Sequence, residues 1–245
     1  MATQASIKKV TLIKTGQTFE ELSATRGCFE RWFGEIFGEH VEEWEVIHAH
    51  RGQALPPLSA PEAVVVTGSP VSVYERLPWS EATGAWLAEL ITREVPVLGV
   101  CYGHQLIAHA LGGEVARSPN GREVGAVEVT HTGDPIFDGL PERFSVWQSH
   151  IDEVTRPPAH AEVIASNEHS AVQAMAIGAR CRTVQWHPEF DGQIGRHYIQ
   201  ARAHLINQER GEGYAAQLVR AQPETLSSGA QIIANFARQW LSSAR

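Results

Sequence analysis

The first hundred residues alternate between short apolar runs and amphipathic stretches. Nearly continuous apolar runs cover residues 9–13, 44–47, 63–66 and 96–100. Such runs are typical of parallel strands that are covered on both faces. Residues 28–37 and 80–93 carry apolar side chains three and four positions apart, and Ser80 is suited to cap the second of these helices. The pattern predicts an α/β fold, a central and mostly parallel sheet flanked by helices.

The pattern changes after Gly113. Shorter, alternating segments cover residues 124–130, 144–148, 163–165, 172–177 and 182–186. We expect an additional small antiparallel portion here, with strands joined by turns rich in proline and glycine. No linker separates the two halves, so one domain is expected over residues 1–245.

The end of the chain is expected to form a C-terminal helical extension at about residues 196–245. An apolar stripe with helical spacing lies near its end, and Ser228 is suited to cap that helix. The stripe consists of Ile232, Ile233, Phe236, Trp240 and Leu241. Packing against the core is its expected role.

A cysteine follows the fourth apolar run, in the segment Gly99-Val100-Cys101-Tyr102-Gly103. This is the cysteine counterpart of the G-x-S-x-G nucleophile elbow, in which glycines permit a tight turn between a strand and a helix. Free cysteine more often packs as a small hydrophobe. Flanking glycines would only weaken an ordinary buried strand, however, so the pattern favours a nucleophile. We expect the helix to begin near His104.

A second segment, Gln185-Trp186-His187-Pro188-Glu189, closes the last apolar run. By itself it is more often a surface loop, with Glu189 as a solvated carboxylate. Paired with an elbow cysteine, His187 is the candidate base that takes the thiol proton and returns it to the leaving amine. Glu189 would orient the imidazole, as the third member of a serine triad does. Together the two segments indicate cysteine-dependent acyl transfer.

Acyl transfer also needs hydrogen-bond donors where negative charge develops on the carbonyl oxygen. The amide N–H of Tyr102 is one candidate, because it directly follows the nucleophile. A second is offered by Gly68, in the turn Thr67-Gly68-Ser69-Pro70 after the third apolar run. A plain strand-to-loop turn is the alternative interpretation of this tetrapeptide.

Composition narrows the range of partners. The 28 acidic residues exceed the 20 basic ones, giving a net charge of −8 with no basic stripe, so no nucleic-acid surface is expected. Three cysteines without C-x-x-C spacing argue against a disulfide framework or zinc ribbon. The polar start at Met1–Ser6, with no long apolar stretch, predicts no signal peptide, no membrane contact and a cytoplasmic location.

Two common kinds of cofactor site are missing from the sequence. His104 and His109 lie five positions apart, so they do not form the H-E-x-x-H arrangement of a zinc site. No Gly-Lys-Ser/Thr occurs, which excludes a phosphate-binding P-loop. We therefore expect neither a metal nor a cofactor.

Two blocks together, residues 99–105 and 185–190, resemble the class I glutamine amidotransferase family. Residues 67–70 and 147–152 resemble it more weakly. Within the family, the chain is similar to the stand-alone GMP synthase-like group, which includes plant γ-glutamyl peptidases. The resemblance implies a flavodoxin-like fold with Cys101, His187 and Glu189 as catalytic triad.

The resemblance also implies a substrate, glutamine. Cys101 would attack its γ-carboxamide, release ammonia and leave a γ-glutamyl thioester for hydrolysis. Gln105 matches a family glutamine that holds the substrate near the elbow, and Gln148-Ser149-His150 matches a segment that binds the α-amino and α-carboxylate groups. Gly68-Ser69 departs from the two glycines of many relatives, which leaves the geometry of that oxyanion amide open.

Three functions remain open at this point. The first is a self-sufficient cysteine amidohydrolase acting on glutamine or another γ-glutamyl compound. The second is a glutaminase subunit that passes ammonia to a separate ATP-dependent synthetase. The third is a catalytically inert binding module on the same scaffold. The loop at residues 71–79 is expected to shape the choice of leaving group.

Overall fold

The computed structural model describes residues 9–241, so Met1–Ser6 and the last four residues of the predicted extension lie outside the described part. A nine-stranded mixed sheet forms its centre, in the order β2-β1-β3-β4-β11-β10-β9-β6-β7. Five neighbouring strands are parallel: β2 (Glu43–Ile47), β1 (Lys9–Ile13), β3 (Val64–Val66), β4 (Val97–Val100) and β11 (Cys181–Val184). The four apolar runs predicted as parallel strands are thereby confirmed.

The other four strands of this sheet are antiparallel to their neighbours. They are β10 (Ala174–Ile177), β9 (Ala161–Ser166), β6 (Glu123–His131) and β7 (Arg143–His150). A separate ribbon pairs β5 (Glu114–Arg117) with β8 (Asp152–Arg156). The antiparallel portion was predicted, but the ribbon was not, because β5 is short and largely exposed and carries no apolar alternation.

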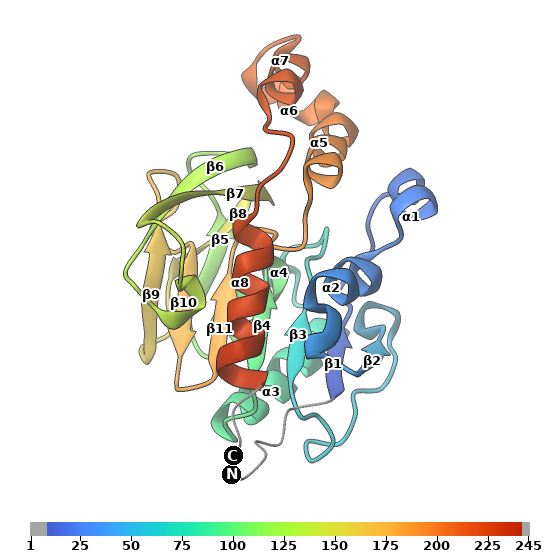
Figure 1. Cartoon of the computed structure of the whole chain (residues 1–245), viewed down its shortest axis with the longest axis vertical. Helices are drawn as coiled ribbons and strands as arrows, with labels where there is room; N and C mark the ends of the chain where they lie inside the picture. The colour runs from blue at the N-terminus through green and yellow to red at the C-terminus, as the bar shows by residue number, and fades with distance from the viewer. Residues whose placement is uncertain (1–8, 242–245) are drawn as a thin grey trace.

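Helices cover both faces of the sheet (Figure 1). On one face, α2 (Phe29–Phe37) and α8 (Ser228–Phe236) bury their apolar sides in the larger core cluster. On the other face, α3 (Pro78–Thr92) and α4 (Tyr102–Ala110) pack in the second cluster. A further helix, α1 (Glu20–Arg26), precedes α2. Short 3-10 turns lie at Gly38–His40, Ala49–Arg51, Val73–Glu75 and Pro135–Phe137, and one π-helical turn lies at Ala237–Leu241.

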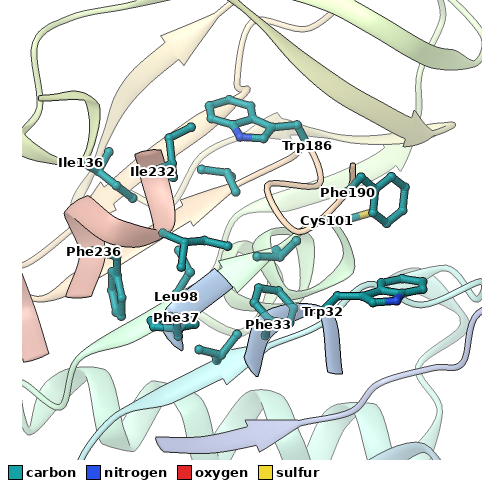
Figure 2. Close-up of a cluster of buried hydrophobic side chains, with 14 of the residues drawn as sticks. Trp32, Phe33, Phe37, Leu98, Cys101, Ile136, Trp186, Phe190, Ile232 and Phe236 are labelled. Carbon is teal, nitrogen blue, oxygen red and sulfur yellow. The ribbon is translucent and has the colours of Figure 1, made fainter. Parts of the chain in front are cut away.

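The larger core cluster reaches from the C-terminal helix to the elbow cysteine. Figure 2 shows Ile232 and Phe236 of α8 at one side, Phe33 of α2 in the middle, and Cys101 beside Phe190 at the other side. All five members of the predicted C-terminal stripe are buried, which confirms their expected role in the core. The elbow cysteine is therefore part of the larger core cluster.

Three helices follow β11 and lie beyond one end of the sheet (Figure 1). They are α5 (Gly192–Ala201), α6 (Ala203–Arg210) and α7 (Tyr214–Ala221). A small cluster of their own, with Ile199, Ile206 and Ala215 as its buried members, holds them together. No helix between residues 9 and 241 has both the length and the apolar character that crossing a membrane requires.

Two predicted helix caps are wrong. The helix α3 begins at Pro78 with Leu77 as its N-cap, because proline fits the first helical position. Ser80 therefore lies inside the helix, where its hydroxyl shares a hydrogen bond of 2.6 Å with the hydroxyl of Tyr102.

Ser228 likewise is the first residue of α8 and not its cap, which is Ser227. The Ser228 hydroxyl donates to the carbonyl oxygen of Ser145 at 2.5 Å and ties the helix to β7. The helix after the elbow also begins at Tyr102, two positions before the predicted start near His104.

Candidate active site

Cys101 lies at the apex of a strained turn between β4 and α4. Its φ of 53° and ψ of −102° place a residue with a side chain in a region that favours glycine. Such a conformation costs on the order of 1–3 kcal/mol and clusters at functional sites. The Cys101 N–H donates to the carbonyl oxygen of Val184 at 2.9 Å, which ties the apex to β11. The predicted elbow geometry is thus present.

The two glycines of the elbow are required by close packing. A Cβ at Gly99 would lie 2.8 Å from Cδ1 of Ile107, and a Cβ at Gly103 would lie 2.7 Å from the carbonyl oxygen of Val66. Both distances are shorter than real Cβ contacts, so a side chain at either position would push α4 away from the sheet. The glycines hold the amino end of α4 against the strand ends, where the positive end of the helix dipole faces Cys101.

His187 and Glu189 follow β11, the strand next to β4. The Nδ1 atom of His187 lies 2.8 Å from Oε1 of Glu189, and both side chains are buried. The imidazole stacks on the ring of Phe190 at a centroid distance of 4.1 Å, and the His187 backbone N–H donates to the carbonyl oxygen of Trp147. The ring is therefore held in one orientation by a carboxylate, an aromatic face and its own backbone.

The Cys101 thiol is a neighbour of the same imidazole. Burial disfavours the charged ring, but electrostatic interactions with Glu189 and Cys101 and hydrogen bonds to both side chains outweigh it and raise the pKa of His187 to about 10. A ring with this pKa carries a positive charge at neutral pH, and a positive charge beside a cysteine favours the thiolate form that a nucleophile needs. The structure thus brings together all three residues of the predicted triad.

Gly68 lies directly beside the imidazole. A Cβ there would approach Cε1 of His187 to 2.9 Å and Cβ of Cys101 to 3.6 Å. The carbonyl oxygen of Gly68 accepts hydrogen bonds from the hydroxyls of Thr15, at 3.0 Å, and Thr67, at 3.2 Å. Only glycine leaves room for the His187 ring at this position.

The second predicted oxyanion donor, the amide of Tyr102, belongs to the first residue of α4. N–H groups in the first turn of a helix have no acceptor within the helix. The Gly68 turn also contacts this helix, because the Gly103 N–H donates to the carbonyl oxygen of Thr67 at 3.2 Å. Both predicted donors therefore lie at the same strand edge as Cys101.

Two cavities meet at Cys101. The first, of about 230 Å³, contains His187 and is walled by aromatic residues. The second, of about 220 Å³, lacks His187 and is lined by polar and charged residues. Both share Ser69, Pro70, Cys101, Ser149 and Arg202. We call them the imidazole cavity and the polar cavity.

Three of the four predicted substrate-binding residues line the polar cavity: Gln105, Ser149 and His150. Gln148 lines neither cavity, and its amide donates to Oε1 of Gln173. The side chain of His150 is also engaged, since its Nδ1 faces the carbonyl oxygen of Asp152 and its Nε2 lies 2.8 Å from Glu123. Ser149 differs from both, because its buried hydroxyl has no hydrogen-bond partner in residues 9–241.

Gln105 is fixed in place within the same wall. Its Nε2 donates to the carbonyl oxygen of Asp152 and to Oε1 of Gln185, both at 2.9 Å. The amide thereby links the elbow helix to Gln185, directly after β11, and to the start of β8. Its position in the cavity wall is compatible with a contact to substrate, and its observed bonds give it a positioning role as well.

Several residues of these cavities were not predicted from the sequence. Tyr198 and Arg202 come from α5 and the residue after it, and Arg122 directly precedes β6. Burial lowers the pKa of Arg202, Tyr198 raises it, and the nearby charge of Arg122 lowers it again. No local motif marks these positions, because only the packing of the C-terminal helices over the strand ends brings them to Cys101.

A metal site is not offered by the part of the chain that the structure describes. Within residues 9–241, no three histidine, cysteine or acidic side chains gather in a way that would hold an ion. All three cysteines are free and buried.

Comparison with known proteins identifies the family of this chain. The family model for class-I glutamine amidotransferases matches residues 39–205. The chain is 43% identical over 161 residues to the GMP synthase of Aeropyrum pernix, covering 65% of this chain and 30% of that protein. It is 39% identical over 147 residues to a glutamine-hydrolysing GMP synthase subunit of Saccharolobus solfataricus, covering 59% of this chain and 75% of that protein.

Solved structures support the same fold. A glutamine amidotransferase from Thermotoga maritima superimposes with a TM-score of 0.77, at 21% identity, over 98% of this chain and 100% of that one. One from Methylobacillus flagellatus gives a TM-score of 0.72, at 22% identity, over 98% and 96% of the two chains. The chain belongs to the class I glutamine amidotransferase family. It spans 24% to 32% of the length of the GMP synthases from Aeropyrum pernix, Corynebacterium ammoniagenes and Thermomicrobium roseum.

Proposed function

We propose that this protein is a cysteine amidohydrolase that cleaves the γ-amide of glutamine, or of another γ-glutamyl compound, through a thioester on Cys101. The observation that carries the proposal is the strained elbow at Cys101 with the buried His187–Glu189 pair beside it. A cysteine that only packs in the core would not require a strained backbone, a charged imidazole beside it and two adjoining cavities. These three features together favour a nucleophile.

The first half of the reaction forms the thioester. The Cys101 thiolate attacks the γ-carbonyl carbon and forms the C–S bond, while the amide of Tyr102 and the Gly68 turn stabilise the oxyanion. The C–N bond then breaks, and the His187 imidazolium gives its proton to the leaving nitrogen. With glutamine as substrate, the product that leaves is ammonia.

Hydrolysis completes the cycle. His187, now neutral, accepts a proton from the attacking water, and the hydroxyl oxygen bonds to the thioester carbon. Collapse of this second tetrahedral intermediate breaks the C–S bond, restores the Cys101 thiolate beside the imidazolium and releases the γ-carboxylic acid, which loses its proton to the solvent. Glu189 stabilises the charged ring in both halves, as the orienting carboxylate of a triad does.

The imidazole cavity has room for the leaving groups of substrates other than glutamine. The leaving nitrogen must lie within reach of His187, so the leaving group occupies this cavity. Ammonia is about the size of water, which takes about 30 Å³ in the liquid. A cavity of about 230 Å³ with Phe19, Phe29 and Tyr198 in its walls therefore also has space for an amine larger than ammonia.

Ammonia delivery to a synthetase is the second candidate function. It is supported by the likeness to the Saccharolobus solfataricus protein, which is named as one subunit of a glutamine-hydrolysing GMP synthase. In this case ammonia passes from Cys101 to a separate ATP-dependent synthetase. Glutaminase activity of the isolated chain would then be low and would rise when the matching synthetase and ATP are added.

Turnover assays test the proposal. The protein is incubated with glutamine and with a panel of γ-glutamyl peptides, beside Cys101→Ala and, as matched control, Cys181→Ala. We expect loss of at least about 1000-fold in Cys101→Ala and little change in Cys181→Ala. Equal activity of the wild-type and Cys101→Ala proteins on every substrate, with and without synthetase, would contradict the proposal and favour an inert module.

A further inference from the structure

The polar cavity contains charged groups that the triad does not use. Arg122, Arg202 and Asp152 line it together with Ser149, and the four come from three separate segments, since Ser149 and Asp152 lie only three positions apart. Two guanidinium groups and one carboxylate around a space of about 220 Å³ match a ligand that carries both a negative and a positive charge.

Among these groups, Arg202 gives the strongest indication of a bound ligand. Its guanidinium stacks over the rings of Phe19, at 4.9 Å, and Tyr198, at 5.1 Å, and it borders both cavities at Cys101. Its Nη1 is buried and has no hydrogen-bond partner in residues 9–241. A buried charged donor without a partner is costly and is a place where a ligand acceptor would be expected.

Arg122 adds a second cation to the same wall. Its Nε is also buried without a hydrogen-bond partner among the described residues, although Glu209 lies 3.5 Å away as an ion-pair partner. The hydroxyl of Ser149, equally buried and unpaired within residues 9–241, completes a set of three donors from three segments. Guanidinium donors of this kind are suited to a carboxylate.

Asp152 supplies the opposite charge and is firmly positioned. Its Oδ2 accepts a hydrogen bond from Ser72 at 2.5 Å, and its Oδ1 accepts one from Tyr74 at 3.0 Å. Its carbonyl oxygen accepts from Gln105, so the residue is held on both sides. Within residues 9–241 the carboxylate receives hydrogen bonds from hydroxyls and no cation pairs with it, which leaves its charge available to an ammonium group.

We propose that Arg202, Arg122 and Ser149 bind the α-carboxylate, and Asp152 the α-ammonium group, of the γ-glutamyl part of the substrate. The assignment rests on the proposed function, because it is His187 that places the leaving group in the imidazole cavity and the acyl part in the polar cavity. In this assignment the side chains of Gln148 and His150 do not bind the amino-acid end of the substrate, because they are hydrogen-bonded to Gln173 and Glu123.

Ligand binding to the Cys101→Ala protein tests the subsite without requiring turnover. Calorimetry compares L-glutamate with glutarate, which lacks the ammonium group, and with 4-aminobutyrate, which lacks the α-carboxylate. We expect L-glutamate to bind roughly 10- to 100-fold more tightly than either analogue, the range expected for one charged hydrogen-bonded pair.

Variants then assign each charge to its residue. In the Cys101→Ala background, Arg202→Gln should abolish the preference for L-glutamate over 4-aminobutyrate and keep most of that over glutarate. Asp152→Asn should abolish the preference for L-glutamate over glutarate and keep most of that over 4-aminobutyrate. Arg202→Lys should regain part of the carboxylate preference, and Arg143→Gln, an exposed arginine paired with Glu128, is the matched control with no change. Arg122→Gln, expected to have a smaller effect of the same kind, serves as second variant if Arg202→Gln does not fold.

A uniform loss of affinity for all three ligands in Arg202→Gln and Arg122→Gln would indicate a structural role and overturn the proposal. So would a selective effect of Arg202→Gln on hydrolysis of γ-glutamylglycine but not of γ-glutamyl methylamide, because the carboxylate would then belong to the leaving group. If the ligand preferences hold but the wild type hydrolyses no γ-glutamyl compound, the proposed function fails and the subsite stands.

Discussion

The two ends of the β4–β11 strand pair carry the same residue type in opposite settings. At one end Cys181 pairs with Val97 in regular strand geometry, is 1% exposed, and has its thiol pKa raised by burial to about 12. At the other end Cys101 leaves the strand in a positive-φ turn and borders two cavities and a charged imidazole. Cysteine becomes a candidate nucleophile here through its place at a strand end, not through its degree of burial, since Cys101 is itself only 6% exposed.

Alkylation should separate the two thiols by the largest margin. Burial raises the pKa of Cys181 to about 12 and so disfavours its thiolate, whereas Cys101 lies beside the His187 imidazolium and a helix N-terminus, which favour a thiolate. We expect iodoacetamide at pH 7 to modify Cys101 roughly 1000-fold or more faster than Cys181, as followed by peptide mass analysis. Comparable rates at Cys101, Cys28 and Cys181 would remove the distinction on which the catalytic assignment depends.

Removing the charge of Glu189 should reduce the difference between Cys101 and Cys181. The expected effect is smaller than the difference in their alkylation rates. In Glu189→Gln the His187 pKa falls from about 10 toward its ordinary value, because the carboxylate no longer offsets burial of the ring. Since the imidazolium is lost as pH rises through its pKa, the alkaline limit of kcat/KM should move to lower pH. The rate near neutral pH should fall about 100-fold or more.

Glu81→Gln is the matched control, because Glu81 lies 3.3 Å from Nε2 of His109 in a partly exposed pair away from Cys101. Its pH–rate profile should coincide with that of the wild type. An unshifted alkaline limit in Glu189→Gln would show that Glu189 does not set the protonation of His187.

A methyl group at Gly68 should give the smallest of the three effects. The added Cβ would lie 2.9 Å from Cε1 of His187, so the ring must move by several tenths of an ångström. We expect kcat to fall about 10- to 100-fold in Gly68→Ala, since small displacements of catalytic groups have effects of this size. Gly34→Ala is the control, because its nearest neighbour is 4.0 Å away in a helix that favours alanine. Equal kcat values in both variants would mean that Gly68 has no part in seating the ring.

The features predicted from the sequence are those that depend on neighbouring residues. Short apolar runs identified four of the five parallel strands, and the glycines around Cys101 identified the elbow, because both patterns have local physical causes. The fifth parallel strand, β11, was expected in the antiparallel portion, because it also pairs with β10 in that sense and its place beside β4 is set by long-range packing. The His187–Glu189 pair was also found, since two residues of spacing are enough to bring Nδ1 to the carboxylate. The caps at Ser80 and Ser228 were wrong, because each serine hydroxyl has a tertiary partner instead.

Features that depend on long-range packing were not predictable. Arg202 reaches Cys101 only because α5 folds back over the strand ends, and nothing near it in the sequence signals this. Asp152 lies inside a segment that resembles the family, yet its proposed role rests on hydrogen bonds from the hydroxyls of Ser72 and Tyr74, far away in the chain. The loop at residues 71–79 thus contacts the wall of the polar cavity through Asp152, and no local sequence pattern signals this contact.

Covalent trapping tests the central claim most directly. The wild-type protein is mixed with glutamine or a γ-glutamyl peptide, quenched in acid within the first turnovers, and digested for mass analysis. We predict a mass increase of one γ-glutamyl group on the peptide that contains Cys101, absent from the Cys181 peptide and removed by hydroxylamine. Turnover of these substrates with no adduct on Cys101 at any quench time, and undiminished turnover in Cys101→Ala, would contradict it.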